Sequence, residues 1–402
     1  MIHFGIDRLL EESALRKPLA GKRLGLLAHP ASVTRDLRHS MDAIVACPDL
    51  RLTCAFGPQH GMRGEKQYNM VESEDYLDPI HGIPVFSLYG TTRRPTAEML
   101  SHCDVVLVDL QDLGCRIYTY LTTLVYMMEA CAALGKKVVV LDRPNPAGRM
   151  MEGSILKPGN ESFVGVRPVL MRHGLTLGEF SEFAKREYSI DVELEVIRMT
   201  GYRMDQGPGY GWPLEERAWV NPSPNAPTLS MARCYAGTVM LEGTHLSEGR
   251  GTTRPLEGFG APDLDGLKLL KGMQSLAPEW LTGCHLRPFY FEPTFYKHQG
   301  KLCSGVQIHT DVSAYEPMNF KPYRIMALAF KVIRNLHPEY PIWRDFPYEY
   351  VFDRLAIDVI TGCETLRHWV DDPAARPADL ETFLSRDESI WKEKVRDATF
   401  YP

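Results

Sequence analysis

Short apolar runs alternate with segments of helical apolar spacing through the first 150 residues, and this alternation constrains the fold more than any other feature. The runs that predict strands are residues 23–28, 50–56, 83–88, 104–110 and 137–141. The segments with helical spacing are residues 4–19, 34–46, 96–99 and 117–134. Strands that alternate with helices pair in parallel, with helices on both faces. The sequence therefore predicts an α/β fold with a Rossmann-like parallel sheet.

This predicted sheet has no nucleotide-binding fingerprint. The turn after its first strand reads AHPASV instead of G-x-G-x-x-G, and the chain contains no G-x-x-x-x-G-K-[ST]. No group of His, Cys and Asp residues has the spacing of a known metal site. We therefore expect neither a nucleotide nor a metal cofactor.

The regular alternation ends after Pro146. Residues 166–172 and 194–199 predict further strands, and residues 175–187 predict a helix with a capping box. The segment NPSPNAP at 221–227 has three prolines and reads as a stiff connector. At 402 residues two domains are expected. We predict a Rossmann-like domain at 1–225 and a smaller α/β or α+β domain at 226–402.

Net charge and cysteine usage limit the partners and the cellular compartment that we expect for this protein. The net charge of −6 argues against a nucleic-acid partner, and no apolar run is long enough to span a membrane. The N-terminal residues lack the apolar core of a signal peptide. Nine scattered cysteines indicate free thiols in a reducing compartment. These features predict a cytoplasmic protein, or a periplasmic one if a leader has been trimmed; they leave the oligomeric state open.

Polar, Gly- and Pro-rich clusters follow each of the predicted strands. They are His29 and residues 57–64, 89–90, 111–116 and 142–146. Open parallel sheets bind ligands at the carboxyl ends of their strands. We therefore expect these clusters to share one edge of the sheet and to form a ligand site there.

The cluster after the second strand offers hydrogen-bonding and ionisable groups. Gln59, His60, Arg63 and Glu65 stand among glycines that let the backbone approach a ligand closely. The alternative is a polar loop in which His60 caps a helix and Glu65 is solvated.

Two further strand ends carry candidates. Asp112, Arg116 and Tyr118 follow the fourth strand, where Asp112 could bind substrate or instead cap a helix and pair with Arg116. Arg143 and Asn145 follow the fifth, in a loop stiffened by prolines. Here the alternative is a turn in which Asn145 satisfies backbone groups.

The segment EGTHLSEGRGTTRP at 242–255 has the composition of an anion-binding loop. It contains Glu248 and Arg250 among glycines and hydroxyl residues. A solvated polar loop is the alternative. Together with Arg63, Arg116 and Arg143, this segment suits a ligand with a carboxylate or phosphate, such as a sugar acid.

Seven stretches, in order and with spacing kept, resemble one known family. They are PQHGMRG, PVFSLYG, DLQDLGCRIYTY, LDRPNPAGR, MRHGLTLGE, NPSPNAPTL and EGTHLSEGRGTTRPLEGFGAP. They resemble the exo-β-N-acetylmuramidases of peptidoglycan turnover, from about Leu24 to the end of the chain. The resemblance implies a Rossmann-like domain, a smaller C-terminal domain and an active-site cleft between them. It also implies a hydrolase of cell wall recycling that releases N-acetylmuramic acid from the non-reducing end of peptidoglycan fragments.

One position departs from the family pattern. The first motif of the family usually reads P-E-H-G, and its Glu is the favoured acid/base, whereas this chain has Gln59. An amide does not exchange a proton near neutral pH. The resemblance then makes Glu65 and Asp112, with His60, the catalytic candidates. The candidates for substrate contacts are Gln59, Arg63, Arg116, Tyr118, Arg143, Asn145, Glu248 and Arg250.

Three mechanisms stay open at this point. Two carboxyl groups can act with retention or inversion, and a 2-acetamido sugar can use its own carbonyl as nucleophile. The alternative function is a binding or sensor protein for a muramic-type sugar that does not hydrolyse it.

Overall fold

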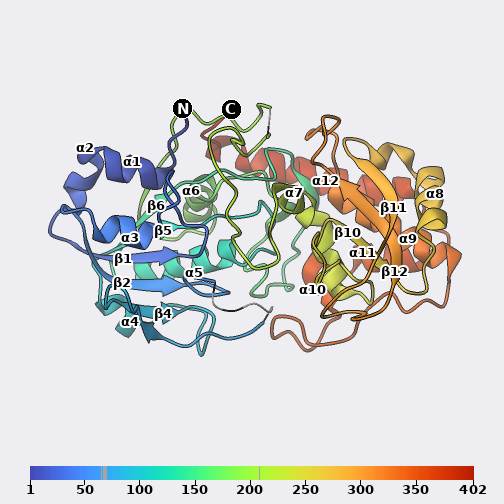
Figure 1. The fold of residues 1–402 in the computed structure, drawn as a ribbon, viewed down its shortest axis with the longest axis horizontal. Helices are drawn as coiled ribbons and strands as arrows, with labels where there is room; N and C mark the ends of the chain where they lie inside the picture. The colour runs from blue at the N-terminus through green and yellow to red at the C-terminus, as the bar shows by residue number, and fades with distance from the viewer. Residues whose placement is uncertain (65, 67–69, 208) are drawn as a thin grey trace.

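A mostly parallel sheet forms the N-terminal half of the molecule (Figure 1). The computed structural model describes residues 1–64, 66, 70–207 and 209–402, and within them the sheet has the strand order β3-β4-β2-β1-β5-β6-β9. The strands are β1 (Arg23–Ala28), β2 (Arg51–Gly57), β3 (Tyr76–Leu77), β4 (Pro84–Ser87), β5 (Val105–Asp109), β6 (Lys137–Leu141) and β9 (Glu193–Ile197). All neighbours pair in parallel except β3, which runs antiparallel to β4. The predicted α/β class is confirmed.

Helices cover both faces of this sheet. Alternate residues of β1 face opposite sides, so that Leu27 joins the cluster under α5 (Tyr120–Ala133) and α6 (Leu177–Glu187). Leu26 joins the cluster under α1 (Gly5–Glu11) and α3 (Ser40–Val45). Burial on both faces explains why these strands read as continuous apolar runs.

Two of the predicted helices are shorter than their apolar spacing indicates. The helix expected at 4–19 breaks at Glu12 into α1, α2 (Ser13–Arg16) and the 3-10 turn η1 (Lys17–Leu19). The helix expected at 34–46 begins only at Ser40. Thr96 caps α4 (Ala97–Ser101), and Thr176 with Glu179 forms the predicted capping box of α6.

The C-terminal half is built around an antiparallel sheet, β10-β12-β11, and is therefore α+β. Its strands are β10 (Gly258–Ala261), β11 (His285–Phe291) and β12 (Cys303–His309). Its helices and 3-10 turns are α7 (Leu229–Thr238), η2 (Val239–Gly243), α8 (Gly266–Leu276), η3 (Pro278–Leu281), α9 (Pro322–Leu336), α10 (Ala356–Thr361), α11 (Thr365–Asp371), α12 (Pro377–Val395) and η4 (Arg396–Ala398). The domain boundary at 225/226 stays a prediction.

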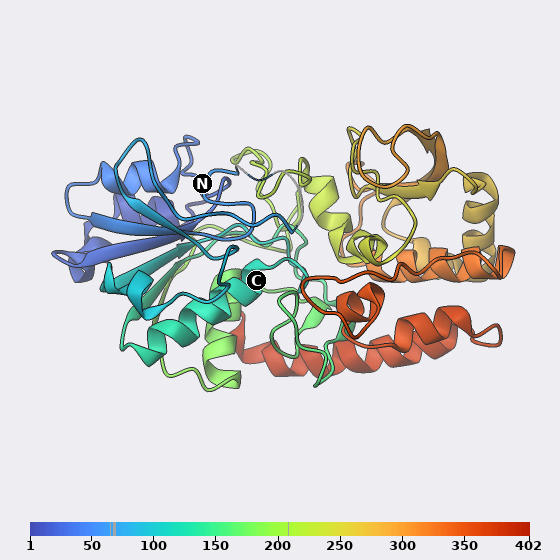
Figure 2. The same ribbon diagram turned by 90° about the horizontal axis from the view of Figure 1, so that it is seen from below.

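The end of the chain returns to the N-terminal half. Helix α12 runs beneath both halves (Figure 2) and packs on β7 (Glu152–Ile155), which pairs with β8 (Leu170–Arg172). Beyond it, the Tyr401 hydroxyl donates to the buried Asp142 carboxylate at 2.7 Å, and the Phe400 amide donates to Glu179 at 2.6 Å. The N-terminal half is therefore completed by residues from the other end of the chain.

Two observations bear on the compartment expected from the sequence: the state of the cysteines and the length of the helices. All nine cysteines are free thiols, most of them buried. Across the described part of the chain, no helix has the length and apolarity needed to cross a membrane.

Candidate active site

A pocket lies where the two halves meet. The N-terminal half lines it with Gln59, His60, Ile117, Tyr118, Thr119, Val164, Ser223 and Asn225. The C-terminal half lines it with Met231, Tyr235, Glu242, Arg250, Leu256, Tyr348 and Glu349. The structure thus brings the PQHG loop after β2 to the anion-type loop at 242–255.

The amide of Gln59 has a defined orientation in this pocket. Thr119 donates its hydroxyl to the side-chain oxygen of Gln59 at 3.0 Å. The amide nitrogen is then the group that acts on the Glu349 carboxyl as a hydrogen-bond donor. Gln59 therefore links the start of α5 to a carboxyl of the C-terminal half.

Glu349 is a buried carboxyl with an unusual proton affinity. Its side chain is 6% exposed, and the Tyr89 hydroxyl lies 3.0 and 3.2 Å from its two oxygens. Burial, together with the nearby charge of Glu242, raises the pKa of Glu349 to about 7 although hydrogen bonds from Tyr89 and Gln59 oppose the rise. Near neutral pH this carboxyl can therefore exist in either form.

A second carboxyl in the pocket has a different environment. Glu242 accepts from the Arg250 guanidinium at 2.5 Å and from the Tyr348 hydroxyl at 2.7 Å. Arg250 also donates to Glu248 at 3.0 Å, and Lys297 pairs with Glu248 at 2.8 Å. Glu242 is therefore paired with a guanidinium, whereas Glu349 has no such ion pair among the described residues.

His60 lines the pocket as a neutral imidazole. Its Nδ1 lies 3.0 Å from the carbonyl of Lys66, so Nδ1 carries the proton and Nε2 is left as an acceptor. Burial, helped by the charge of Arg250, lowers the pKa of His60 to about 4. His60 does not cap a helix; it can accept a hydrogen bond from a sugar hydroxyl.

The segment that carries Glu349 is held in a constrained conformation against the N-terminal half. Glu349 and Tyr350 both have left-handed φ angles, 46° and 67°, which cost non-glycine residues about 1 kcal/mol or more each. The Tyr350 hydroxyl donates to Glu72 at 2.9 Å. The Arg93 guanidinium lies 4.4 Å from the ring centroids of both Tyr89 and Tyr350. These contacts between the halves offset the strain and fix the carboxyl in the pocket.

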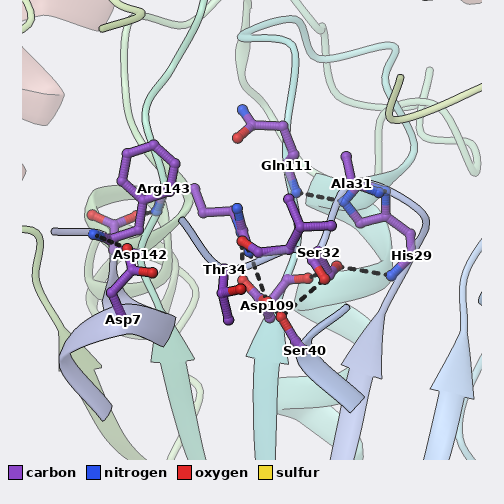
Figure 3. Close-up of polar contacts among 12 residues, drawn as sticks. Asp7, His29, Ala31, Ser32, Thr34, Ser40, Asp109, Gln111, Asp142 and Arg143 are labelled. Carbon is purple, nitrogen blue, oxygen red and sulfur yellow. Dashed lines mark hydrogen bonds and ion pairs between the residues drawn. The ribbon is translucent and has the colours of Figure 1, made fainter. Parts of the chain in front are cut away.

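A buried polar network occupies the edge of the sheet at the carboxyl ends of β1, β5 and β6 (Figure 3). Arg143 forms a two-pronged ion pair with Asp109, with an Nη2–Oδ2 distance of 2.9 Å. The backbone N–H of Gln111 donates to His29 Nε2 at 2.7 Å. Arg143 therefore joins the ends of these strands and is absent from the lining of the pocket between the halves.

Asp112 and Arg116 also lie outside the pocket lining. Arg116 is 1% exposed and donates to the carbonyls of Ser154, Val169 and Ile360 at 2.7–2.9 Å. The suggested cap and ion pair do not form because α5 begins at Tyr120, with Thr119 at its N-cap. Asp112 instead accepts from the Gly114 amide and lies 3.2 Å from His173 Nε2.

Three other predicted site residues make contacts outside the pocket lining, and a fourth lies outside the described residues. Arg63 pairs with Asp42 at 3.0 Å and Asp78 at 3.3 Å. Asn145 holds its own turn by accepting from Ala147 and donating to Leu175, as the alternative interpretation expected. Glu248 contacts Arg250 and Lys297 just behind the lining. Glu65 lies outside the described residues.

Of the predicted site residues, the pocket lining contains Gln59, His60, Tyr118 and Arg250. Glu349 and its partners Tyr89 and Thr119 are not among the site residues predicted from the sequence. The available signal was a carboxylate between two tyrosines in the aromatic stretch FPYEYVF, since lone carboxylates are seldom buried without a role.

A carboxyl of raised pKa and a second one held by a cation, in one pocket of a two-part α/β protein, are typical of glycosidases. The chain belongs to the NamZ family of exo-β-N-acetylmuramidases: the N-terminal family model matches residues 24–230 and the C-terminal model residues 233–401. It is 41% identical over 357 residues to the peptidoglycan β-N-acetylmuramidase NamZ of Bacillus subtilis (strain 168). That match covers 88% of this chain and 82% of the relative.

Two solved structures share the fold. Both are DUF1343 family proteins of Bacteroides fragilis NCTC 9343, and both alignments cover 100% of this chain and 99% of the other. The first has a TM-score of 0.85 at 28% identity, and the second 0.74 at 24% identity. The expected family and its two-part architecture are confirmed.

Proposed function

We propose that this chain hydrolyses the β-glycosidic bond of an N-acetylmuramic acid residue at the non-reducing end of peptidoglycan fragments. The observation that carries the proposal is the pocket between the halves, which is lined by Glu349, a carboxyl of raised pKa, and by Glu242, a carboxyl paired with Arg250. The activity named for the Bacillus subtilis relative supports the substrate class. A pocket, in contrast to an open groove, suits removal of a terminal sugar.

The binding-protein alternative rested on the loss of a carboxyl at Gln59. Glu349 weakens that argument because it places a carboxyl next to the Gln59 amide. Hydrolysis is therefore the favoured function. We further propose that it takes place in the cytoplasm, as the cysteine usage suggests.

The direct test uses two disaccharides that differ only in the order of their sugars. Purified protein is incubated with N-acetylmuramyl-β-1,4-N-acetylglucosamine and with the reverse disaccharide, and free sugars are measured by mass spectrometry. We expect N-acetylmuramic acid to be released from the first disaccharide alone. Equal cleavage of both, or of neither, would refute the proposal.

We propose that Arg250 recognises the lactyl carboxylate that distinguishes muramic acid from glucosamine. Arg250 lines the pocket, whereas Arg63 is held between two aspartates away from the lining. Arg250→Lys keeps the charge opposite Glu242 and Glu248 but loses the planar fork that binds a carboxylate. Arg63→Lys is the matched control.

The readout is the preference for an aryl β-N-acetylmuramide over the matching N-acetylglucosaminide. Arg250→Lys should narrow this preference about tenfold to hundredfold, while Arg63→Lys should leave it unchanged. An unchanged preference in folded Arg250→Lys would assign Arg250 to pocket structure alone.

A further inference from the structure

We propose that Glu349 is the proton donor to the glycosidic oxygen and that Gln59, Thr119 and Tyr89 position it. The inference rests on the proposed function, since it assigns a role within that reaction. It gives the acid role to a residue of the C-terminal half, whereas the PQHG loop supplies an oriented amide.

Position is the first support for this assignment. Glu349 lines the pocket together with Gln59, His60 and Tyr118. Its segment is fixed from both sides by the Tyr89 hydroxyl and by the contact of Tyr350 with Glu72. A proton donor must be held within hydrogen-bond reach of its acceptor. These contacts restrict the movement of the Glu349 side chain and keep it at the pocket.

Charge is the second support. Among the described carboxyls that line the pocket, Glu242 has a guanidinium partner and Glu349 does not. Burial near Glu242 keeps the proton on Glu349 up to about neutral pH. The Arg93 guanidinium stacks on Tyr89 and Tyr350, and its charge lowers the pKa of Glu349 by less than burial raises it.

The step follows from the neutral carboxyl. Glu349 passes its proton to the glycosidic oxygen while the bond between that oxygen and C1 breaks, and the bonding pair stays on the oxygen. The leaving sugar departs as an alcohol. The oxygen of a water molecule bonds to C1, and one proton of that water returns to the Glu349 carboxylate.

Leaving-group dependence separates a proton donor from a residue that only shapes the pocket. A disaccharide needs protonation of its leaving oxygen, whereas a 2,4-dinitrophenyl β-N-acetylmuramide does not. Glu349→Gln should lower kcat/KM for the disaccharide by about 10²- to 10⁴-fold and for the dinitrophenyl substrate by less than about tenfold. Asp353→Asn, an exposed carboxylate on the same segment, is the matched control and should alter neither rate.

Each result has one interpretation. Equal losses on both substrates, or no loss on either, in a Glu349→Gln protein with wild-type circular dichroism would overturn the acid role while leaving the proposed function intact. If the wild-type protein cleaves neither substrate, the proposed function fails and the acid role fails with it.

The positioning role of Tyr89 has its own readout. The Tyr89 hydroxyl stabilises the ionised form of Glu349, so Tyr89→Phe should raise the pH at which disaccharide cleavage declines. A lower rate with an unmoved pH profile would assign Tyr89 to packing and remove it from the positioning set.

Discussion

Replacing Glu349 by Gln should remove one pH-dependent contribution to the free energy of unfolding. The variant should therefore gain stability relative to wild type as the pH rises from 5 to 8. The folded protein binds the Glu349 proton more tightly than the unfolded chain does, because burial raises the pKa from 4.5 to about 7. The contribution of this group to stability is therefore complete below pH 4.5 and is lost as the pH rises through 7. At about 1.4 kcal/mol per pKa unit, the loss between pH 5 and pH 8 is roughly 2 to 3 kcal/mol.

The measurement compares the free energies of unfolding of wild type and Glu349→Gln in urea at pH 5 and pH 8. Other groups that titrate in this range, such as the buried Asp142, contribute equally to both proteins and cancel in the difference. The variant should gain roughly 2 to 3 kcal/mol on wild type between the two pH values. In Asp353→Asn the difference from wild type should stay constant.

The quantity to follow is the difference in free energy of unfolding between wild type and Glu349→Gln. If this difference changes by less than about 1 kcal/mol between pH 5 and pH 8, the reasoning is refuted. That result would mean that Glu349 is ionised in the folded protein at pH 7 as readily as in water. An acid that destabilises the fold at working pH is a known cost of a functional site.

Three further predictions concern neighbours of the pocket. Arg116→Met leaves three buried carbonyls without their donor and should lower the free energy of unfolding in urea by about 3 kcal/mol or more. Thr119→Val removes the hydroxyl that orients Gln59 and should lower kcat/KM on the disaccharide about tenfold, with an unchanged melting temperature within a few degrees. The His60 ring should show no protonation by NMR until the pH approaches 4; a titration near 6.5 would contradict the burial argument.

The parallel sheet was predictable because its signal is local. Strands buried on both faces are continuous apolar runs, and the bounds expected for β1 and β6, at residues 23–28 and 137–141, agree with the structure at both ends. The location of the polar clusters at one sheet edge followed from parallel pairing alone.

The electrostatics of the site were not predictable in the same way. Glu349 acquires its proton affinity from burial and from the nearby charge of Glu242, and the hydroxyl that opposes the rise comes from Tyr89, which is 260 positions away in the sequence. The spacing of Asp112 and Arg116 suggested an ion pair only on the assumption of a helix, and α5 starts four residues after Arg116. Which arginine faces the pocket depends on side-chain contacts that no sequence spacing specifies.

The contacts of Tyr401 also constrain how the protein is made. Domains usually fold as they leave the ribosome, N-terminal part first. Here Asp142, at the end of β6, receives one of its hydrogen bonds from the Tyr401 hydroxyl, and Glu179 receives another from Phe400. The N-terminal half therefore cannot reach its final hydrogen bonding while the rest of the chain is being synthesised, and its last step follows translation of residue 401.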